Sequence, residues 1–233
     1  MRPLELIEAP PLDAAGQMGL DEAILAHGPK GAVHLRFYRW LRPAVTFGYS
    51  QPWMYAAEQA KARGLAGADL VRRATGGGVV FHDGDLTFSV VFPWERLSAP
   101  SLIYKNIHRG VHLGLKHEHI ATRLWSPEKP HSSGSVLEKA CFGGVPEPMD
   151  LVREDGLKVL GGALRRRGER GLYQGSFRID VLAAPLTTVR AAIVDGLTRE
   201  FGHLPGLELE SRWLEQGEEL ALKYRSDRWN KRR

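Results

Sequence analysis

Cys141 is the only cysteine in this chain of 233 residues and its strongest candidate nucleophile. It follows a segment, 126–134, whose composition predicts a mobile loop, and it precedes Gly143, Gly144 and Pro146. A lone cysteine is most often a small buried hydrophobe, but this setting is more typical of a site than of a core. An ordinary thiol, with a pKa of about 8.5, is mostly protonated at neutral pH. A nucleophilic Cys141 therefore needs a nearby cation or base.

Lys158 offers such a cation within an otherwise apolar predicted strand. Strand alternation would allow this lysine simply to point into solvent. Yet Gly161 and Gly162 follow three and four residues later, and they remove side chains that would keep a ligand from the backbone. An ammonium held there would lower the pKa of a neighbouring thiol and donate a hydrogen bond to a carbonyl oxygen.

A glycine-rich run forms the third candidate, with the sequence Arg-Arg-Ala-Thr-Gly-Gly-Gly-Val-Val-Phe-His-Asp over residues 72–83. Three glycines let a backbone approach a ligand closely, and the arginines suit an anion or a carbonyl group. No Gly-Lys-Ser/Thr follows, so it is not a P-loop, and the element after it reads as a strand, unlike a dinucleotide fingerprint. A glycine-rich hairpin with solvated arginines is the alternative. The flanking Arg-Arg and His-Asp favour ligand binding.

The histidine and cysteine content argues against a metal centre. His108 and His112 stand four apart on a predicted helix, but Arg-Gly-Val separates them and no zincin glutamate is present. A polar helix face is the favoured interpretation, and we predict no metal. One thiolate cannot build a disulfide framework, a zinc ribbon or an iron–sulfur cluster. It indicates a reducing compartment, and we expect the cytoplasm.

The net charge of +5 is concentrated in two places. The last ten residues, 224–233, carry a local charge of +4 and are expected to form a frayed, solvated tail. Residues 165–170 carry another +3. The remainder is slightly acidic, which disfavours nucleic acid as the partner. The chain contains no apolar run of eighteen residues, so we predict no membrane span.

Hydrophobic periodicity predicts one α+β domain over residues 1–233, a mixed, largely antiparallel sheet flanked by helices. Asp13 caps a helix to about His27, a second helix covers 101–116, and two helices close the chain. The segment 33–40 alternates as a half-buried strand, and strands at 44–48, 70–73, 79–82 and 86–92 are expected to form an antiparallel meander. Three more strands are predicted at 149–153, 157–166 and 171–177.

Together these segments resemble the octanoyltransferase and lipoate-protein ligase family, which shares its fold with biotin-protein ligases. The resemblance rests on residues 18–23, 47–51, the run at 72–83 and the Lys158 strand. It implies a biotin/lipoate protein ligase-like fold with a buried acyl-chain tunnel roofed by the glycine-rich run. Gln174 stands where the family often has histidine, and Gly162 where serine is common. The resemblance, together with the residue chemistry above, gives two catalytic residues, Cys141 and Lys158, and ten substrate-binding residues: Arg72, Arg73, Thr75, Gly76, Gly77, Gly78, His82, Gly161, Gly162 and Ala163.

The segment around Cys141 is similar to the nucleophile segment of the cysteine-dependent octanoyltransferases. That resemblance implies transfer of an octanoyl or lipoyl group from an acyl carrier protein, through a Cys141 thioester, to a lysine of a lipoyl domain. The acceptor would belong to a 2-oxoacid dehydrogenase subunit or a glycine cleavage H protein. A thioester is already activated, so no cofactor is required. The alternatives are an ATP-dependent lipoate-protein ligase, which would need ATP and Mg²⁺, and a non-catalytic module that binds carrier proteins or nucleic acid.

Overall fold

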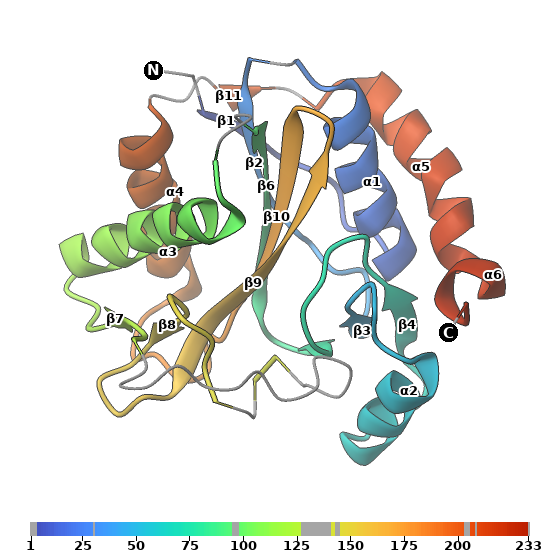
Figure 1. Cartoon of the computed structure of the whole chain (residues 1–233), viewed down its shortest axis with the longest axis horizontal. Coiled ribbons are helices and arrows are strands. Elements are labelled where there is room, and N and C mark those ends of the chain that lie inside the picture. Colours follow the sequence, from blue (N-terminus) through green and yellow to red (C-terminus); the bar gives the residue numbers. More distant parts are fainter. Residues whose placement is uncertain are drawn as a thin grey trace.

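A computed structural model describes residues 4–29, 31–94, 98–126, 141–142, 145–202, 206–207 and 209–232. Its main sheet lies between two pairs of helices (Figure 1). The helices are α1 (Ala14–His27), α2 (Trp53–Ala62), α3 (Pro100–His117), α4 (Leu186–Phe201), α5 (Ser211–Arg225) and α6 (Asp227–Asn230). The strands are β1 (Leu4–Ile7), β2 (Val33–Phe37), β3 (Ala44–Phe47), β4 (Asp69–Arg72), β5 (Val80–His82), β6 (Leu86–Pro93), β7 (Arg123–Leu124), β8 (Leu151–Val152), β9 (Lys158–Arg167), β10 (Arg170–Phe177) and β11 (Gly206–Leu207).

The main sheet has eight strands among the described residues, in the order β11-β1-β2-β6-β10-β9-β8-β7. Only the β11–β1 and β1–β2 pairs are parallel, so the sheet is mixed and largely antiparallel, as the sequence predicts. The hairpin of β9 and β10 runs through its centre and places Gly162 opposite Gly175. The predicted α+β fold is confirmed.

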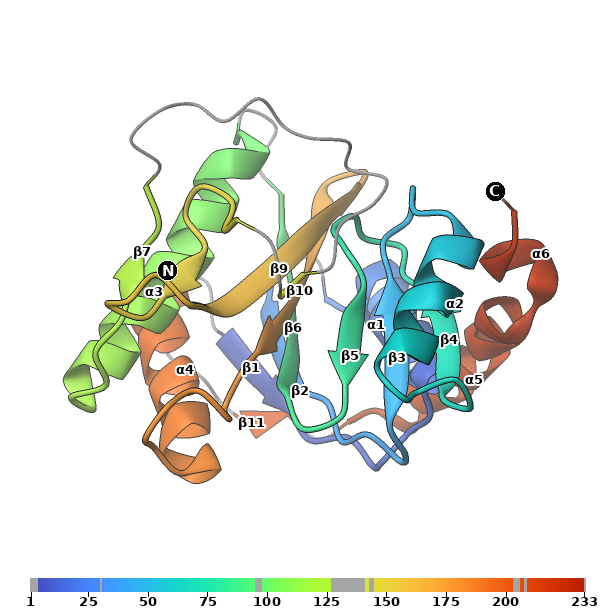
Figure 2. The same cartoon turned by 90° about the horizontal axis from the view of Figure 1, so that it is seen from below.

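Three short strands form a second sheet in the order β4-β3-β5, beside which α2 packs. Figure 2 shows it on the same side of the main sheet as α1 and α5. The expected antiparallel meander is wrong, because β3 pairs with β4 in parallel and with β5 antiparallel. The helix α2 connects β3 to β4, and such a crossover is what parallel pairing requires.

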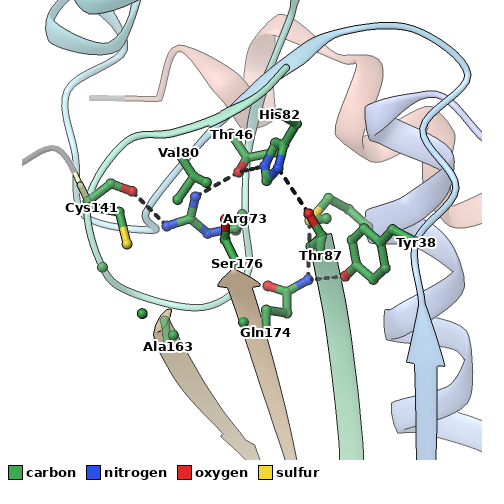
Figure 3. Close-up of a pocket in the computed structure, with 16 residues that line it drawn as sticks. Tyr38, Thr46, Arg73, Val80, His82, Thr87, Cys141, Ala163, Gln174 and Ser176 are labelled. Atoms are coloured by element: carbon green, nitrogen blue, oxygen red, sulfur yellow. Dashed lines mark hydrogen bonds between the residues drawn. The ribbon is translucent and has the colours of Figure 1, made fainter. Parts of the chain in front are cut away.

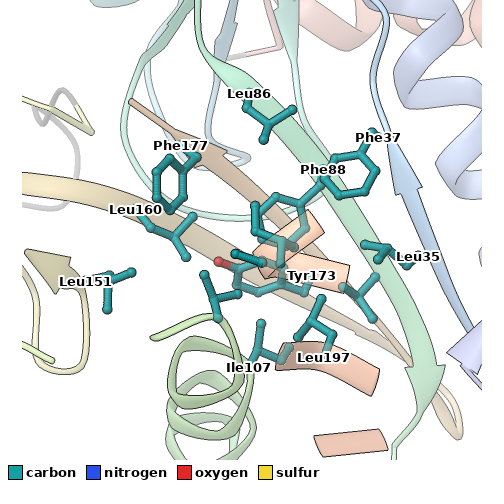
Figure 4. Packing of buried hydrophobic residues seen from close by; sticks show 14 of the residues in the cluster. Leu35, Phe37, Leu86, Phe88, Ile107, Leu151, Leu160, Tyr173, Phe177 and Leu197 are labelled. Carbon is teal, nitrogen blue, oxygen red and sulfur yellow. The ribbon is translucent and has the colours of Figure 1, made fainter. Parts of the chain in front are cut away.

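Helices cover both faces of the main sheet. The largest apolar cluster joins α3 and α4 to strands that include β6, β9 and β10 (Figure 4). On the other face, α1 packs closely against α5, where any side chain at Gly19 would clash with the backbone of Gly217. Within the described parts of the chain, no helix combines the length and apolarity needed to cross a membrane.

The strand β2 is buried on both faces, so the expected half-buried strand is wrong. Its polar residues, His34 and Arg36, lie under α1 and α5 rather than in solvent. The predicted helix after Asp13 is confirmed, since the Asp13 carboxylate accepts from the N–H of Gly16 at 2.7 Å.

The basic tail is folded through residue 232, which corrects the expectation of a frayed terminus. The side chain of Asn230 is buried and accepts a hydrogen bond from the N–H of Arg72 at 2.8 Å. The indole of Trp229 donates to the carbonyl of Arg72 at 2.8 Å. These contacts fix α6 against β4.

Candidate active site

A pocket of about 400 Å³ opens between the glycine-rich run and the β9–β10 hairpin (Figure 3). Eight of the predicted site residues line it: Arg73, Gly77, Gly78, His82, Cys141, Gly161, Gly162 and Ala163. Eight residues that the sequence did not single out for the site complete its wall: Met18, Tyr38, Thr46, Val80, Thr87, Gln174, Gly175 and Ser176.

The glycine-rich run is held in place by Arg73. Its buried guanidinium donates to the carbonyl oxygens of Gly76 and Gly78, at 2.9 and 2.7 Å, and to the hydroxyl of Thr46 at 2.8 Å. Gly77 has a φ of +83°, a conformation that favours glycine. Burial lowers the pKa of Arg73 to about 10, so it stays charged at neutral pH.

Arg72 points the other way and does not line the pocket. Its fully buried guanidinium donates to the backbone carbonyls of Tyr49, Gln51, Trp229 and Asn230. Arg72 therefore has a structural role: it connects the edge strand β4 to α6.

Cys141 and Lys158 meet at one end of the pocket. The N–H of Cys141 donates to the carbonyl of Val79 at 2.8 Å, which places the cysteine beside the glycine-rich run. Its sulfur lies near the Lys158 ammonium, whose charge acts to lower the pKa of the thiol. Residues 127–140 and 143–144 lie outside the described residues, and with them nearly all of the predicted 126–134 loop.

Gly161 makes this meeting possible. A Cβ atom there would lie 2.6 Å from Lys158 Nζ and 2.8 Å from Cys141 Sγ, closer than real atoms approach. A Cβ on the next residue, Gly162, would clash with the ring of Tyr173. The two glycines therefore leave room for the reactive side chains and for a buried tyrosine.

The Lys158 ammonium also contacts a buried carboxylate. Its Nζ lies 2.7 Å from Oδ2 of Asp150, a residue with no solvent exposure. The hydroxyl of Tyr104 donates to Oδ1 of Asp150 at 2.6 Å and accepts from the N–H of Gly162 at 3.1 Å. These contacts connect α3, β8 and β9 behind the pocket.

Burial dominates the electrostatics at this end. It raises the pKa of the Cys141 thiol above its ordinary value, and Lys158 and Arg73 only partly oppose the rise. Burial alone would lower the pKa of Lys158, but the charges of Cys141 and Asp150 raise it above the ordinary value. Lys158 is therefore charged at neutral pH.

His82 lies on the opposite wall with Asp85. Its Nδ1 is 3.0 Å from Asp85 Oδ2, and its Nε2 is 2.8 Å from the Thr46 hydroxyl. Because Arg73 donates to that hydroxyl, the hydroxyl's own proton is available for Nε2, which leaves Nδ1 to donate to Asp85. Burial would raise the pKa of Asp85, but His82 and the Ser176 hydroxyl hold it below its ordinary value.

Gln174 lies across the pocket from Cys141 in Figure 3. Its amide nitrogen donates to Asp21 at 2.8 Å and to the Tyr38 hydroxyl at 2.9 Å, and its oxygen accepts from the predicted site residue Thr75 at 2.7 Å. Asp21 in turn accepts from the buried guanidinium of Arg36. A glutamine at the position where the family often has histidine thus belongs to a saturated hydrogen-bond network.

Sequence reasoning singled out Cys141 and Lys158 but not Asp150, Tyr104 or Tyr38. The sequence places Asp150 within the predicted strand at 149–153, where nothing marks it as a site residue, and β8 begins one residue after it. Its place beside Lys158 follows from the pairing of β8 with β9, in which Val152 lies opposite Lys158 and the register shifts between Leu151 and Val152. Sequence alone does not predict that shift.

The two candidate histidine ligands do not share a site. His108 is buried, with Nε2 at 2.8 Å from the Tyr173 hydroxyl, whereas His112 contacts Thr122. Among the residues described, no three His, Cys, Asp or Glu side chains gather in a way that could bind a metal ion.

Comparison with known proteins places the chain in a family. Residues 13–196 match the lipoyl protein ligase A/B catalytic domain. The octanoyltransferase LipM of Carboxydothermus hydrogenoformans is 36% identical over 170 residues, which span 71% of this chain and 61% of that protein. The LipM of Brevibacillus brevis is 31% identical over 272 residues, spanning 95% of this chain and 96% of the relative.

Solved structures agree on the fold. A lipoate-protein ligase A bound with ATP superposes with a TM-score of 0.77 at 23% identity, covering 99% of this chain and 98% of that one. A bipartite lipoate protein ligase from Thermoplasma acidophilum, solved with its E2 lipoyl domain, gives the same TM-score at 22% identity, covering 99% and 97%. This chain therefore belongs to the lipoyl protein ligase A/B catalytic-domain family, in which it is similar to the two LipM octanoyltransferases above.

Proposed function

We propose that this protein transfers an octanoyl group from an acyl carrier protein thioester to a lysine of a lipoyl domain, through a thioester on Cys141. The observation that carries the proposal is the closeness of the Cys141 sulfur and the Lys158 ammonium, which both lie within 3 Å of the point where a Cβ of Gly161 would stand. Two relatives that match this chain, at 36% and 31% identity, are octanoyltransferases by name. The proposed site of action is the cytoplasm.

The chemistry proceeds in two balanced steps. In the first, Cys141 sulfur attacks the thioester carbonyl, a new carbon–sulfur bond forms, and the carrier sulfur leaves and takes up the thiol proton. In the second, a lysine ε-amine attacks the enzyme thioester, an amide forms, and Cys141 regains its proton. Lys158 stabilises the thiolate and donates to the carbonyl oxygen that becomes negative in each transition state.

The pocket suits an acyl chain more than a polar ligand. Met18, Val80 and Ala163 supply apolar wall, as hydrophobic side chains do in most small-molecule sites. Gly77 and Gly78 allow a substrate carbonyl to approach the backbone. An octanoyl chain would extend from Cys141 toward Gln174.

The carrier domains would dock on exposed basic residues. Arg165, Arg166 and Arg167 are exposed at the end of β9, and acidic carriers would be steered toward them. Arg170, which the sequence grouped with them, is buried and donates to the carbonyl of Gly28 at 2.7 Å. It is therefore left out of the proposed docking surface.

A nucleotide-free transfer assay tests the function. The protein is incubated with octanoyl-acyl carrier protein and a lipoyl domain, and octanoylation of the domain is followed by mass. We expect turnover without ATP, and none above background with Cys141→Ala. A strict requirement for ATP would indicate the competing function, ligation through an acyl-adenylate. Full activity of Cys141→Ala would overturn the covalent route.

A further inference from the structure

Asp150 is a buried carboxylate whose side chain serves the site more than the sheet. Both of its oxygens are occupied: Oδ1 accepts from Tyr104, and Oδ2 lies 2.7 Å from both Lys158 Nζ and the backbone nitrogen of Glu147. A buried charge persists only when it is paired and hydrogen-bonded in this way. Asp150 is thus held firmly enough to fix whatever it binds.

Lys158 needs such an anchor. A lysine ammonium is a point charge on a flexible four-carbon stem, so it has no preferred direction of its own. Only 11% of its side chain is exposed, and its Nζ lies between the Asp150 carboxylate and the Cys141 sulfur. The missing side chain at Gly161 leaves the space in which nitrogen and sulfur meet.

We propose that Asp150 is a positioning residue, which anchors the Lys158 ammonium beside the Cys141 sulfur and balances its charge until substrate arrives. The substrate part of this role rests on the proposed function. The coupling of the three groups does not, because it can be measured without substrate.

The groups around the sulfur determine the expected effect. Among the described residues, the charged or titratable side chains that interact with it are Lys158, Asp150, Arg73, Tyr104 and Tyr173, and His108 interacts with Lys158. The charge of Asp150 raises the pKa of the Cys141 thiol, whereas Lys158 and Arg73 lower it. An uncharged residue of the same shape at position 150 should therefore give more thiolate at neutral pH.

Alkylation of Cys141 by iodoacetamide, measured against pH, tests the coupling. In Asp150→Asn we expect the inflection of the rate profile to move down by about one pH unit. Asp155→Asn is the matched control, since Asp155 is an exposed carboxylate paired with Arg153, and its profile should match the wild type. If Asp150→Asn does not fold, Asp150→Ser, which leaves room for a water beside Lys158, is expected to shift the profile in the same direction.

Octanoyl transfer by the same variants tests positioning. Although its thiol ionises more readily, Asp150→Asn should have a kcat about 10–100-fold lower with little change in KM, as for other residues that orient a reactive group. Asp150→Glu should recover part of the loss. In a Lys158→Met background, Asp150→Asn should cost less than a further twofold.

The outcomes separate this inference from the proposed function. An unshifted alkylation profile in a folded Asp150→Asn variant would overturn the inference, and so would wild-type turnover by that variant. A shifted profile in a protein whose wild type transfers no octanoyl group would instead overturn the proposed function and leave the coupling intact.

Discussion

Two buried clusters flank the pocket and contain the same three kinds of group: a carboxylate, a cation and a tyrosine hydroxyl. The Asp21 cluster contains Asp21, Arg36 and Tyr38, and the Asp150 cluster contains Asp150, Lys158 and Tyr104. In both, the carboxylate is fully buried and accepts from the tyrosine. They differ in the cation and in what lies beyond it.

Arginine makes the first cluster rigid. The Arg36 guanidinium donates to Asp21 and also to the side chain and carbonyl of Gln17, so all three of its nitrogens are engaged. In the second cluster the single ammonium of Lys158 contacts both Asp150 and the Cys141 sulfur. The same arrangement thus stabilises the fold on one side of the pocket and presents a reactive group on the other.

The largest expected effect is on stability, in the Asp21 cluster. Arg36→Met leaves a buried carboxylate without its cation, which should lower the free energy of unfolding by about 3–5 kcal/mol. Thermal unfolding measures the loss. Arg42→Met removes a surface pair with Asp69, in which the arginine side chain is 56% exposed, and should cost no more than about 1 kcal/mol. Similar losses in the two variants would mean that the Asp21 cluster is not structural.

The matching substitution in the Asp150 cluster, Lys158→Met, should affect the rate of transfer more than the stability of the fold. Lys158→Met removes the donor to the developing oxyanion, and octanoyl transfer should fall by about 10²–10³-fold. Its melting temperature should fall less than that of Arg36→Met, because that substitution also removes the bonds from Arg36 to Gln17, whereas Lys158 is partly exposed and pairs with Asp150. Steady-state kinetics and thermal unfolding of both variants check the contrast, and a larger stability loss in Lys158→Met would reverse it.

Low pH should destabilise the fold beside the Asp150 cluster, where the ring of His108 stacks on that of Tyr104. Burial and the nearby charge of Lys158 lower the pKa of His108 to about 3. An unfolded histidine has a pKa of about 6.5, so below that pH only the unfolded chain takes up the proton. The stability that neutral His108 confers is therefore present above pH 6.5 and lost as the pH falls toward 3, by up to about 1.4 kcal/mol per unit.

Urea unfolding between pH 7 and 4.5 measures this loss. His108→Gln should weaken the pH dependence by about 1 kcal/mol per unit. His117→Gln, which alters an exposed histidine, should leave it unchanged. Equal slopes for all three proteins would show that His108 is already protonated when folded.

The smallest expected effect on the rate of transfer comes from adding one methyl group, in Gly161→Ala. Gly161→Ala would press on Lys158 Nζ and Cys141 Sγ, and displacing them should slow transfer about tenfold or more, since misplacement by 1 Å can cost 10²-fold. Both neighbours are ends of flexible side chains, so stability should change little. Gly67→Ala, where no atom lies within 4 Å, is the control. Unchanged transfer by Gly161→Ala would show that the position of the pair is not critical.

The sequence predicts a contact in the site well when the contact depends on local residues, and poorly when it joins residues far apart in the sequence. Residue type and local setting were enough to select Cys141 and Lys158 and to expect that they interact, because thiol chemistry requires a cation. Asp150 could not be found in this way, since it reaches Lys158 only through the irregular pairing of β8 with β9. The same limit applies to the Asp21 cluster, which joins α1 to β2 and β10.

The adjacent arginines show the limit most clearly. Strand alternation predicts that Arg72 and Arg73 point in opposite directions, but not which one faces the ligand. The answer depends on α6, which binds Arg72 from a position more than 150 residues away in the sequence. Local elements such as the Asp13 cap were predicted correctly because their partners lie within one turn.

The covalent intermediate gives the most direct test of the proposed reaction. The protein is mixed with octanoyl-acyl carrier protein in the absence of nucleotide, and its intact mass is measured before and after a lipoyl domain is added. We expect a gain of about 126 Da, one octanoyl group on Cys141, which disappears as the domain gains the same mass and never forms on Cys141→Ser. Octanoylation of the domain with no adduct on the protein, or an adduct that persists in Cys141→Ser, would contradict a Cys141 thioester.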